Sequence, residues 1–250
     1  MLPPPDVRKK LGASSLIMGI DIETHDWEER SRGNQRSLGQ FGFYSLCHPD
    51  DFNARVVQLG WAIGGYGGTP SVKEKIVRPE GFVISVKAAK YHGITQENAT
   101  TQGCDLKGVL DEFFDDLLDV QRRGGRIVVH HLEFDCGIIA RELHRVAPQR
   151  LDTWRQIAKE GLCTMDPSIG HWVRACFGQE LGPQSNANTM RLSQLVTLLM
   201  PGQNPHFGSQ HTAGADAHRH WSLYFALLKL AGIEVARGAT VNQGQAPSAS

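Results

Sequence analysis

The hydrophobic residues in the first part of the chain fall into short runs that are typical of strands. Residues 16–22 form an apolar run broken by Asp21, which predicts a buried strand with a carboxylate near its carboxyl end. A second apolar run covers residues 56–63. The glycine-rich residues 64–68 and the following residues 72–77 then predict a hairpin to a third strand.

Helical spacing is clearest in residues 105–122, where apolar residues recur at three- and four-residue steps. The other side of this helix is acidic and carries Asp111, Glu112, Asp115, Asp116 and Asp119. Carboxylates opposite an apolar stripe usually form a solvated face, and a metal-binding role is the alternative. A fourth strand is expected at residues 126–130, and further helices at residues 134–146, at residues 191–200 and after Gly214.

The order of these elements indicates the fold class. Strands come first and helices then alternate with strands, which predicts an α/β domain with a mixed β-sheet flanked by helices. We expect this domain to span residues 16–232, with an insert at about residues 24–55. A loop-rich segment is expected between residues 148 and 203, with a possible strand at residues 162–165. Residues 1–15 are expected to form a flexible N-terminal segment, and residues 233–250 a disordered tail.

The charge of the chain limits how it could contact nucleic acid. Its 26 Lys and Arg residues balance its 26 Asp and Glu residues. Proteins that coat duplex nucleic acid by counterion release usually carry a basic excess. Any such contact is therefore expected to be local, at a strand end in a site whose rim carries small basic clusters such as Arg122, Arg123 and Arg126.

The number and spacing of the cysteines indicate the redox environment in which the protein works. The chain has five cysteines, an odd number, and none of them forms a C-x-x-C pair. This disfavours a disulfide framework and a structural zinc site, and we expect an intracellular protein of a reducing compartment, either the cytoplasm or the nucleus. No run of eighteen apolar residues occurs, so no membrane partner is expected.

Acidic residues occur at three places, each at the end of a predicted strand or the start of a predicted helix, where they could form a metal-binding site. Asp21 and Glu23 are two residues apart on a strand, so their side chains leave from the same face and are best tolerated around a divalent cation. Asp135 follows the fourth strand, where a first-turn helix acid is the alternative. His211 precedes Asp216 by five residues, where a surface histidine and a helix acid are the alternative.

Taken in order, these segments resemble the three motifs of the DEDDh family, the DnaQ-like 3′–5′ exonucleases of the ribonuclease H-like superfamily. Residues 91–95, with the sequence YHGIT, resemble the segment between the first two motifs. Residues 162–166 and 192–195 resemble the strand after the second motif and the helix before the third. The similarity covers roughly residues 16–230 apart from the insert, and it implies a ribonuclease H-like α/β fold.

The resemblance implies a role for each acidic residue. Asp21, Glu23 and Asp216 would ligate two Mg²⁺ ions, for which Mn²⁺ would substitute, and Asp135 would reach the second ion directly or through water. His211 would deprotonate the attacking water, and nucleoside 5′-monophosphates would leave from the 3′ end of DNA or RNA. Two oxygen-bound divalent ions and an imidazole also meet the chemical needs of phosphodiester hydrolysis.

Binding roles follow from the same resemblance. Thr24, His92 and Phe134 match positions that embrace the terminal nucleotide, although Phe134 is equally well read as a core residue. The chain departs from the family pattern at His131, where many relatives have asparagine. We expect a nucleic-acid partner with a free 3′ end, short or single-stranded. Oligomeric state and the choice between DNA and RNA do not follow from the sequence.

The insert is the larger departure from the family pattern. Its aromatic and basic residues are Trp27, Phe41, Phe43, Tyr44, Arg30, Arg32 and Arg36. Such residues beside an active site can stack on and clamp a single strand, and an ordinary surface loop is the alternative. Two other functions stay open: a catalytically inactive nucleic-acid-binding module on the same fold, and an unrelated metal-dependent phosphoesterase.

Overall fold

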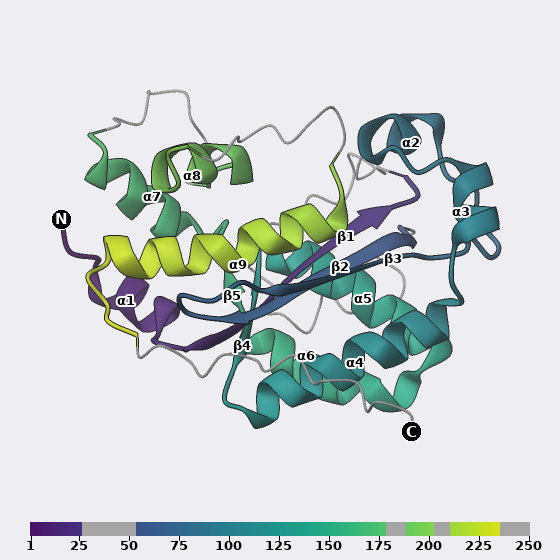
Figure 1. The fold of residues 1–250 in the computed structure, drawn as a ribbon, viewed down its shortest axis with the longest axis horizontal. Coiled ribbons are helices and arrows are strands. Elements are labelled where there is room, and N and C mark those ends of the chain that lie inside the picture. The colour runs from purple at the N-terminus through teal and green to yellow at the C-terminus, as the bar shows by residue number, and fades with distance from the viewer. Residues whose placement is uncertain (27–53, 179–188, 203–210, 236–250) are drawn as a thin grey trace, which may run out of the picture.

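The computed structural model describes residues 1–26, 54–178, 189–202 and 211–235, which together form one sheet and its covering helices (Figure 1). The strands are β1 (Leu16–Thr24), β2 (Val56–Gly65), β3 (Ser71–Ile76), β4 (Arg126–Val129) and β5 (Leu162–Cys163). Their order in the sheet is β3-β2-β1-β4-β5. The β1–β2 and β2–β3 pairs are antiparallel, whereas β4 runs parallel to both β1 and β5. The predicted mixed sheet is confirmed.

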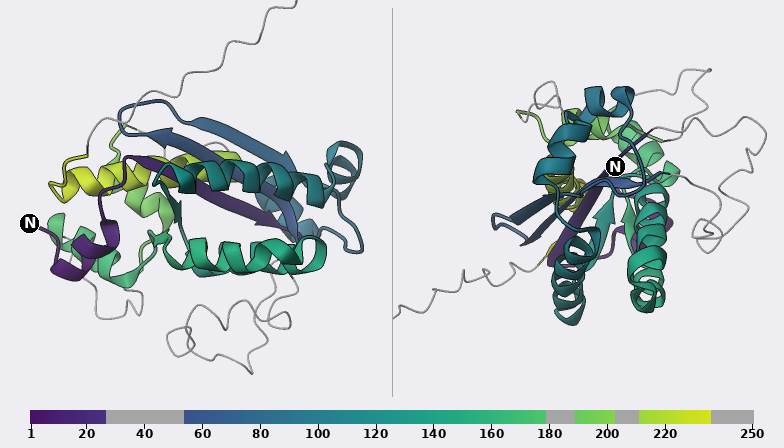
Figure 2. Two further views of the ribbon diagram at one scale, coloured as in Figure 1. Left: turned by 90° about the horizontal axis from the view of Figure 1, so that it is seen from below. Right: turned by 90° about the vertical axis from the view of Figure 1, so that its right-hand side faces the viewer.

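Helices cover both faces of the sheet. They are α1 (Pro5–Leu11), α2 (Val86–His92), α3 (Gln96–Gln102), α4 (Leu106–Arg122), α5 (Leu132–Val146), α6 (Leu151–Lys159), α7 (Pro167–Cys176), α8 (Leu192–Leu199) and α9 (Ala213–Leu230). A short 3-10 helix, Pro148–Arg150, precedes α6. Helices α4, α5 and α6 pack on one face, and α9 crosses the other together with α1, α7 and α8 (Figures 1 and 2). The expectation of helices flanking the sheet is confirmed.

Alternation along β1 decides which side of the sheet carries the acidic residues. Met18, Ile20 and Ile22 are buried in the hydrophobic cluster under α4, α5 and α6. Asp21 and Glu23 therefore project from the opposite face, toward Asp216 of α9. Strand β1 thus places two carboxylates on the face that α9 covers, while the side chains on its other face pack in the core beneath α4, α5 and α6.

Helix α9 lies directly on the sheet because the strand residues beneath it are small. A Cβ atom at Gly60 of β2 would lie 2.2 Å from the carbonyl carbon of Ala213. A Cβ atom at Gly19 of β1 would lie 2.1 Å from the carbonyl oxygen of Ala217. Real Cβ atoms do not come so close to backbone, so only glycine fits at both positions. The first turns of α9 are thereby set against the carboxyl end of β1.

The N-terminal segment differs from expectation. Residues 5–11 form helix α1 rather than a flexible segment, and Val7 and Leu11 are fully buried in the cluster around α9. A proline at the first helical position, Pro5, favours the start of this helix. At the other end, Ile233 and Val235 pack against the same cluster, and residues 236–250 of the expected tail lie outside the described residues.

The segment expected to be loop-rich contains two helices that were not expected, so that prediction is wrong over residues 151–159 and 167–176, whereas the possible strand at residues 162–165 is confirmed by β5. Trp154 of α6 and Trp172 of α7 are almost completely buried, each on a helix of no more than ten residues. Helices this short gain their stability from tertiary packing, which the local pattern does not report. Residues 27–53, which make up most of the expected insert, lie outside the described residues.

The acidic side of α4 is paired with basic residues. Glu112 binds Lys75 at 2.8 Å and Asp116 binds Lys73 at 2.7 Å, so part of this side docks against β3. Asp116 also accepts a hydrogen bond from Nε1 of Trp61 at 2.7 Å. All five carboxylates stay at least partly exposed, as expected of a solvated face, and among the described residues none of them joins a group suited to a metal ion.

The arginines expected at the rim of a site lie elsewhere. Arg122 and Arg123 pair with Asp119 at the end of α4. Arg126 donates to the backbone oxygens of Lys10, Leu11 and Glu160 at the start of β4, whereas Asp135 follows the end of that strand. The prediction that these three arginines rim the acidic site is wrong, because their side chains bind partners near the start of β4, at the opposite end of the sheet.

Two expectations from composition can be compared with the described residues. The described cysteines, Cys104, Cys136, Cys163 and Cys176, all carry free thiols. No helix in the described ranges is both long enough and apolar enough to cross a bilayer.

Candidate active site

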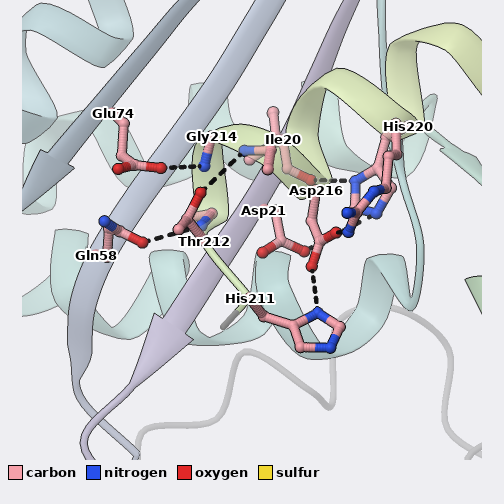
Figure 3. Close-up of polar contacts among 12 residues, drawn as sticks. Ile20, Asp21, Gln58, Glu74, His211, Thr212, Gly214, Asp216 and His220 are labelled. Carbon is pink, nitrogen blue, oxygen red and sulfur yellow. Dashed lines mark hydrogen bonds and ion pairs between the residues drawn. The ribbon is translucent and has the colours of Figure 1, made fainter. Parts of the chain in front are cut away.

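Three carboxylates converge where β1 meets the first turn of α9. Asp21 and Glu23 come from β1 and Asp216 from α9, and one oxygen of each lies within 4.8 Å of the others. Glu23 and Asp216 are only 7% and 6% exposed. The structure therefore brings together three of the four acidic residues that the sequence singled out, in a largely buried group. Figure 3 shows two of them, Asp21 and Asp216, with their carboxylates side by side.

The electrostatics of this group favour a bound cation. Burial, and then the charges of Asp135, Asp216 and Glu23, raise the pKa of Asp21 well above its usual range. Burial and the neighbouring carboxylates of Asp216 and Glu74 raise the pKa of Glu23 to about 8. A divalent cation would remove this cost by neutralising the ionised carboxylates. A donor set made only of carboxylate oxygens suits Mg²⁺ or Mn²⁺.

Asp135 lies beside this group without belonging to it. It occupies the first turn of α5, where its position at a helix N-terminus also agrees with the alternative reading of the sequence. Its carboxylate is almost completely buried, and its charge is the second-largest influence on the pKa of Asp21. Burial and the charge of Glu23 raise the pKa of Asp135 itself. Asp135 thus lies near enough to the three-carboxylate group for their charges to interact.

His211 is hydrogen-bonded to Asp216. The two atoms, Nδ1 of His211 and Oδ2 of Asp216, are 3.1 Å apart (Figure 3). A carboxylate can only accept, so Nδ1 carries the proton and Nε2 of the neutral ring carries the lone pair. The His211 side chain is 45% exposed. A ring in this tautomer, at the open side of the acidic group, has the form needed for a general base.

The N-terminus of α9 is held by side chains of three elements. Thr212 caps it by accepting from the backbone N–H of Ala215 at 3.2 Å. Gln58 of β2 accepts from the N–H of Ala213 at 2.9 Å, and Glu74 of β3 accepts from the N–H of Gly214 at 2.7 Å (Figure 3). These bonds satisfy N–H groups that have no partner within the helix. They fix the turn from which Asp216 projects.

Arg219 is a residue that the sequence analysis missed. It lies one helical turn after Asp216, is 5% exposed, and forms a buried ion pair with Oδ1 of that residue. Its positive charge also lowers the pKa of Asp21. The spacing of three residues on one helix was a usable signal, because side chains at that spacing face the same direction.

A fully buried histidine, His220, lies beside the acidic group, and a partly buried one, His130, lies next to it. His220 is fully buried, donates from Nδ1 to the carbonyl oxygen of Ile20 at 2.7 Å, and places Nε2 3.9 Å from Oδ1 of Asp21 (Figure 3). Nδ1 of His130 lies 2.9 Å from the hydroxyl of Thr164. Burial lowers the pKa of His220 to about 4 and that of His130 to about 3. Both rings are therefore neutral near pH 7 and add no counter-charge to the site.

His92 ties α2 to the end of β1. Its Nδ1 accepts from the N–H of Ile94 at 3.1 Å, so its Nε2 carries the proton and donates to the carbonyl oxygen of Thr24 at 3.2 Å. The side chain is 3% exposed, and burial lowers its pKa. His92 thus fixes the backbone of Thr24 next to Glu23, and both of its ring nitrogens are engaged with backbone.

The departure at His131 has a conformational explanation. His131 has a φ of 74° and a ψ of 47°. Among the described residues it is the only one other than glycine with a positive φ. Asparagine and histidine both tolerate this left-handed conformation better than most residues. The ring of His131 stacks on Phe134 at a centroid distance of 5.4 Å. Phe134 is partly buried and packs against the core as well as against His131.

No protein-family model and no curated protein matches the chain. Among solved structures, the zinc-bound complex of E. coli exonuclease I with single-stranded DNA is similar with a TM-score of 0.56 and 16% identity, over 88% of this chain and 42% of that one. Exonuclease I with a dT13 oligonucleotide gives a TM-score of 0.55 and 15% identity, over 86% and 41% of the two chains.

A full-length 3′-exonuclease is similar over nearly its whole length. It gives a TM-score of 0.53 and 16% identity, over 96% of this chain and 92% of that one. The chain spans less than half the length of exonuclease I. These likenesses are in structure rather than in sequence, and they show a shared fold. The chain has the ribonuclease H-like α/β fold, with a mixed sheet flanked by helices.

Proposed function

We propose that this chain is a metal-dependent 3′–5′ exonuclease of the DEDDh type. It would hydrolyse phosphodiester bonds from the 3′ end of DNA or RNA and release nucleoside 5′-monophosphates. The observation that carries the proposal is the buried group of Asp21, Glu23 and Asp216, with oxygens within 4.8 Å of one another, next to His211. The fold shared with exonuclease I and a 3′-exonuclease supports it.

The four carboxylates would hold two divalent ions. Asp21, Glu23 and Asp216 form the closer set, and Asp135 would serve the second ion directly or through water. Bound ions of this kind neutralise charge on the attacking and leaving oxygens and make water a nucleophile at neutral pH. Mg²⁺ is the ion that we expect, with Mn²⁺ as a substitute.

His211 would act as the general base. Its bond to Asp216 keeps the proton on Nδ1 and leaves the lone pair of Nε2 to take a proton from the attacking water. Gln58, Glu74 and Thr212 fix the backbone at the N-terminus of α9, directly after His211 and around its partner Asp216. Preorganisation of this kind reduces the entropy cost of the reaction.

The substrate would be a strand with a free 3′ end, single-stranded or short. The balanced charge of the chain supports a local contact, and the exonuclease I structures were solved with single-stranded DNA and an oligonucleotide. Thr24 at the end of β1 and Phe134 on α5 are the residues that we propose at the terminal nucleotide. His92 would act indirectly, through its bond to the Thr24 carbonyl.

The test is a time course on matched single-stranded DNA and RNA oligonucleotides, labelled at either end. With Mg²⁺ or Mn²⁺, 5′-labelled strands should shorten one nucleotide at a time, and 3′-labelled strands should release a labelled mononucleotide at once. EDTA and Asp21→Asn should stop both. Asp152→Asn is the matched control, because the Asp152 side chain is 88% exposed and far from the group along the chain.

Inert wild-type protein would reject the enzyme proposal. If such protein still bound the oligonucleotides, the alternative of an inactive nucleic-acid-binding module would replace it. Internal cleavage of a circular single strand would instead point to an endonuclease or another metal-dependent phosphoesterase.

A further inference from the structure

Tyr91 stacks on His211. The two rings are nearly parallel, with an angle of 5° between their planes and a centroid distance of 4.8 Å. Tyr91 belongs to α2 and His211 immediately precedes the N-cap of α9, so the contact joins residues far apart in the sequence. The Tyr91 side chain has no place in the roles proposed above, and it is 50% exposed.

The backbone that carries Tyr91 is held firmly at the rim of the site. Its neighbour His92 is tied to Thr24 at the end of β1, and Gly93 ends α2 in the left-handed conformation. At the start of α2, Ser85 caps the helix and its backbone N–H donates to the carbonyl oxygen of His25 at 2.8 Å. Both ends of this short helix are therefore fixed next to the acidic group.

The hydrogen bond to Asp216 does not by itself orient the His211 ring. A single bond at Nδ1 fixes one atom, and the outer torsion of a histidine side chain has broad, shallow minima. The ring could swing about that bond and carry Nε2 away from the acidic group. A flat aromatic surface against one face of the imidazole removes that freedom, because parallel rings resist tilting out of contact.

We propose that Tyr91 is a positioning residue for His211, which it holds by ring stacking so that Nε2 stays directed at the attacking water. This inference rests on the proposed exonuclease function, in which His211 is the base. The phenol ring, rather than its hydroxyl, does the positioning. One face of the Tyr91 ring is already covered by His211, so the contact is made before any nucleotide arrives.

The electrostatic setting agrees with this role. Burial, and then the charges of Glu23, Asp216 and Asp21, raise the pKa of the Tyr91 hydroxyl. The hydroxyl therefore stays protonated at neutral pH and adds no further negative charge beside the carboxylates. A neutral aromatic wall is compatible with the acidic group, whereas an anionic one would not be.

The test compares Tyr91→Ala, Tyr91→Leu and Tyr91→Phe by steady-state kinetics on a single-stranded oligonucleotide. Losing a stack of this kind should lower kcat by roughly 2- to 12-fold and change KM by less than about twofold. Tyr91→Phe should keep the wild-type kcat because it keeps the ring. Tyr66→Ala is the control, since Tyr66 is also partly exposed and packs on Phe225, at the opposite end of β1 from the acidic group.

A second measurement reads the stack without any reaction. In metal-free protein, the carbon-bound ring protons of His211, assigned with His211→Ala, should be shifted upfield by the Tyr91 ring. The shift should persist in Tyr91→Phe and vanish in Tyr91→Ala and Tyr91→Leu. Thermal unfolding of each variant checks that the fold is retained, and two truncations guard against one of them failing to fold.

Three results would overturn the inference. An unchanged kcat in both truncations would remove the role, a loss confined to KM would make Tyr91 a substrate contact, and a Tyr91→Phe variant as impaired as Tyr91→Ala would assign the effect to the hydroxyl. An inactive wild-type protein would instead refute the exonuclease proposal, and the proton shifts would then still report whether the stack exists.

Discussion

Arg219 and Asp216 form an ion pair that is buried one helical turn along α9, inside a cluster of carboxylates. The pair supplies a positive charge where three acidic side chains would otherwise face one another without one. His211 binds the other oxygen of Asp216, so this carboxylate is held from two sides. The protein thus carries part of the counter-charge of its own site.

Replacing Arg219 by Gln should therefore destabilise the metal-free protein more than the metal-bound protein. Removing one partner of a buried pair costs about 3 to 5 kcal/mol. Urea unfolding in EDTA should report a loss of that order, and saturating Mg²⁺ should recover part of it. Arg122→Gln removes an exposed pair with the same spacing, to Asp119, and should cost less than about 1 kcal/mol. Equal losses in the two variants would contradict this account.

The stability of the metal-free protein should fall as pH rises from about 5 to about 8. The pKa of Glu23 is raised to about 8 in the folded state, above its ordinary value, so the folded protein binds a proton that the unfolded chain releases. Stability from that proton is fully present below the unfolded pKa and is lost as pH rises through the folded pKa. Melting temperatures in EDTA across this range measure the slope.

Glu23→Gln should flatten that slope. The variant should also melt a few degrees higher than the wild type at pH 8 without metal, which corresponds to about 1 to 3 kcal/mol. Its activity should be lost because a ligand is gone. Glu97→Gln, at an exposed position, should leave the slope as it is. A wild-type profile that rises with pH in EDTA would show that the carboxylates are already ionised and compensated in the folded protein.

Gly60→Ala should displace the start of α9. The added Cβ would lie 2.2 Å from the carbonyl carbon of Ala213, and neither backbone can yield as a flexible side chain would. We expect a cost of about 2 kcal/mol or more, together with reduced activity in the molecules that still fold. Gly68→Ala, whose Cβ would meet only the Gly65 carbonyl oxygen at 3.5 Å, should be close to neutral. Thermal unfolding and initial rates measure both effects.

His211→Ala should separate catalysis from metal binding. The carboxylate group remains, so titration calorimetry with Mn²⁺ should give an affinity near that of the wild type. Turnover should fall by roughly 10²- to 10⁴-fold because the general base is lost. His171→Ala, an exposed histidine on α7, should change neither quantity. Full activity in His211→Ala would require another base.

The sequence predicted the parts of the fold and site that depend on local pattern. The apolar run of residues 16–22 predicted a strand, the spacing of two residues placed Asp21 and Glu23 on one face of it, and the structure brings both next to Asp216. The helix of residues 105–122 and the strands at residues 56–63 and 126–130 were also found where they were expected.

What the sequence did not report depends on packing between distant segments. Helix α1 has only two buried residues, Val7 and Leu11, and it is stabilised by contact with the cluster around α9. The stack of Tyr91 on His211 arises only after α2 and α9 have docked at the same end of the sheet. No local periodicity encodes such a contact, because the contact depends on where α2 and α9 pack against the sheet.

The glycines under α9 have a consequence for how the molecule can change. At Gly19 and Gly60 main chain meets main chain, so the distance between β1 and α9 is not set by the rotamers of any intervening side chains. The larger of the two main side-chain clusters lies on the other face, beneath α4, α5 and α6. Substitutions there can loosen the protein while the spacing of the acidic oxygens is preserved. Stability and site geometry are therefore separately adjustable in this chain.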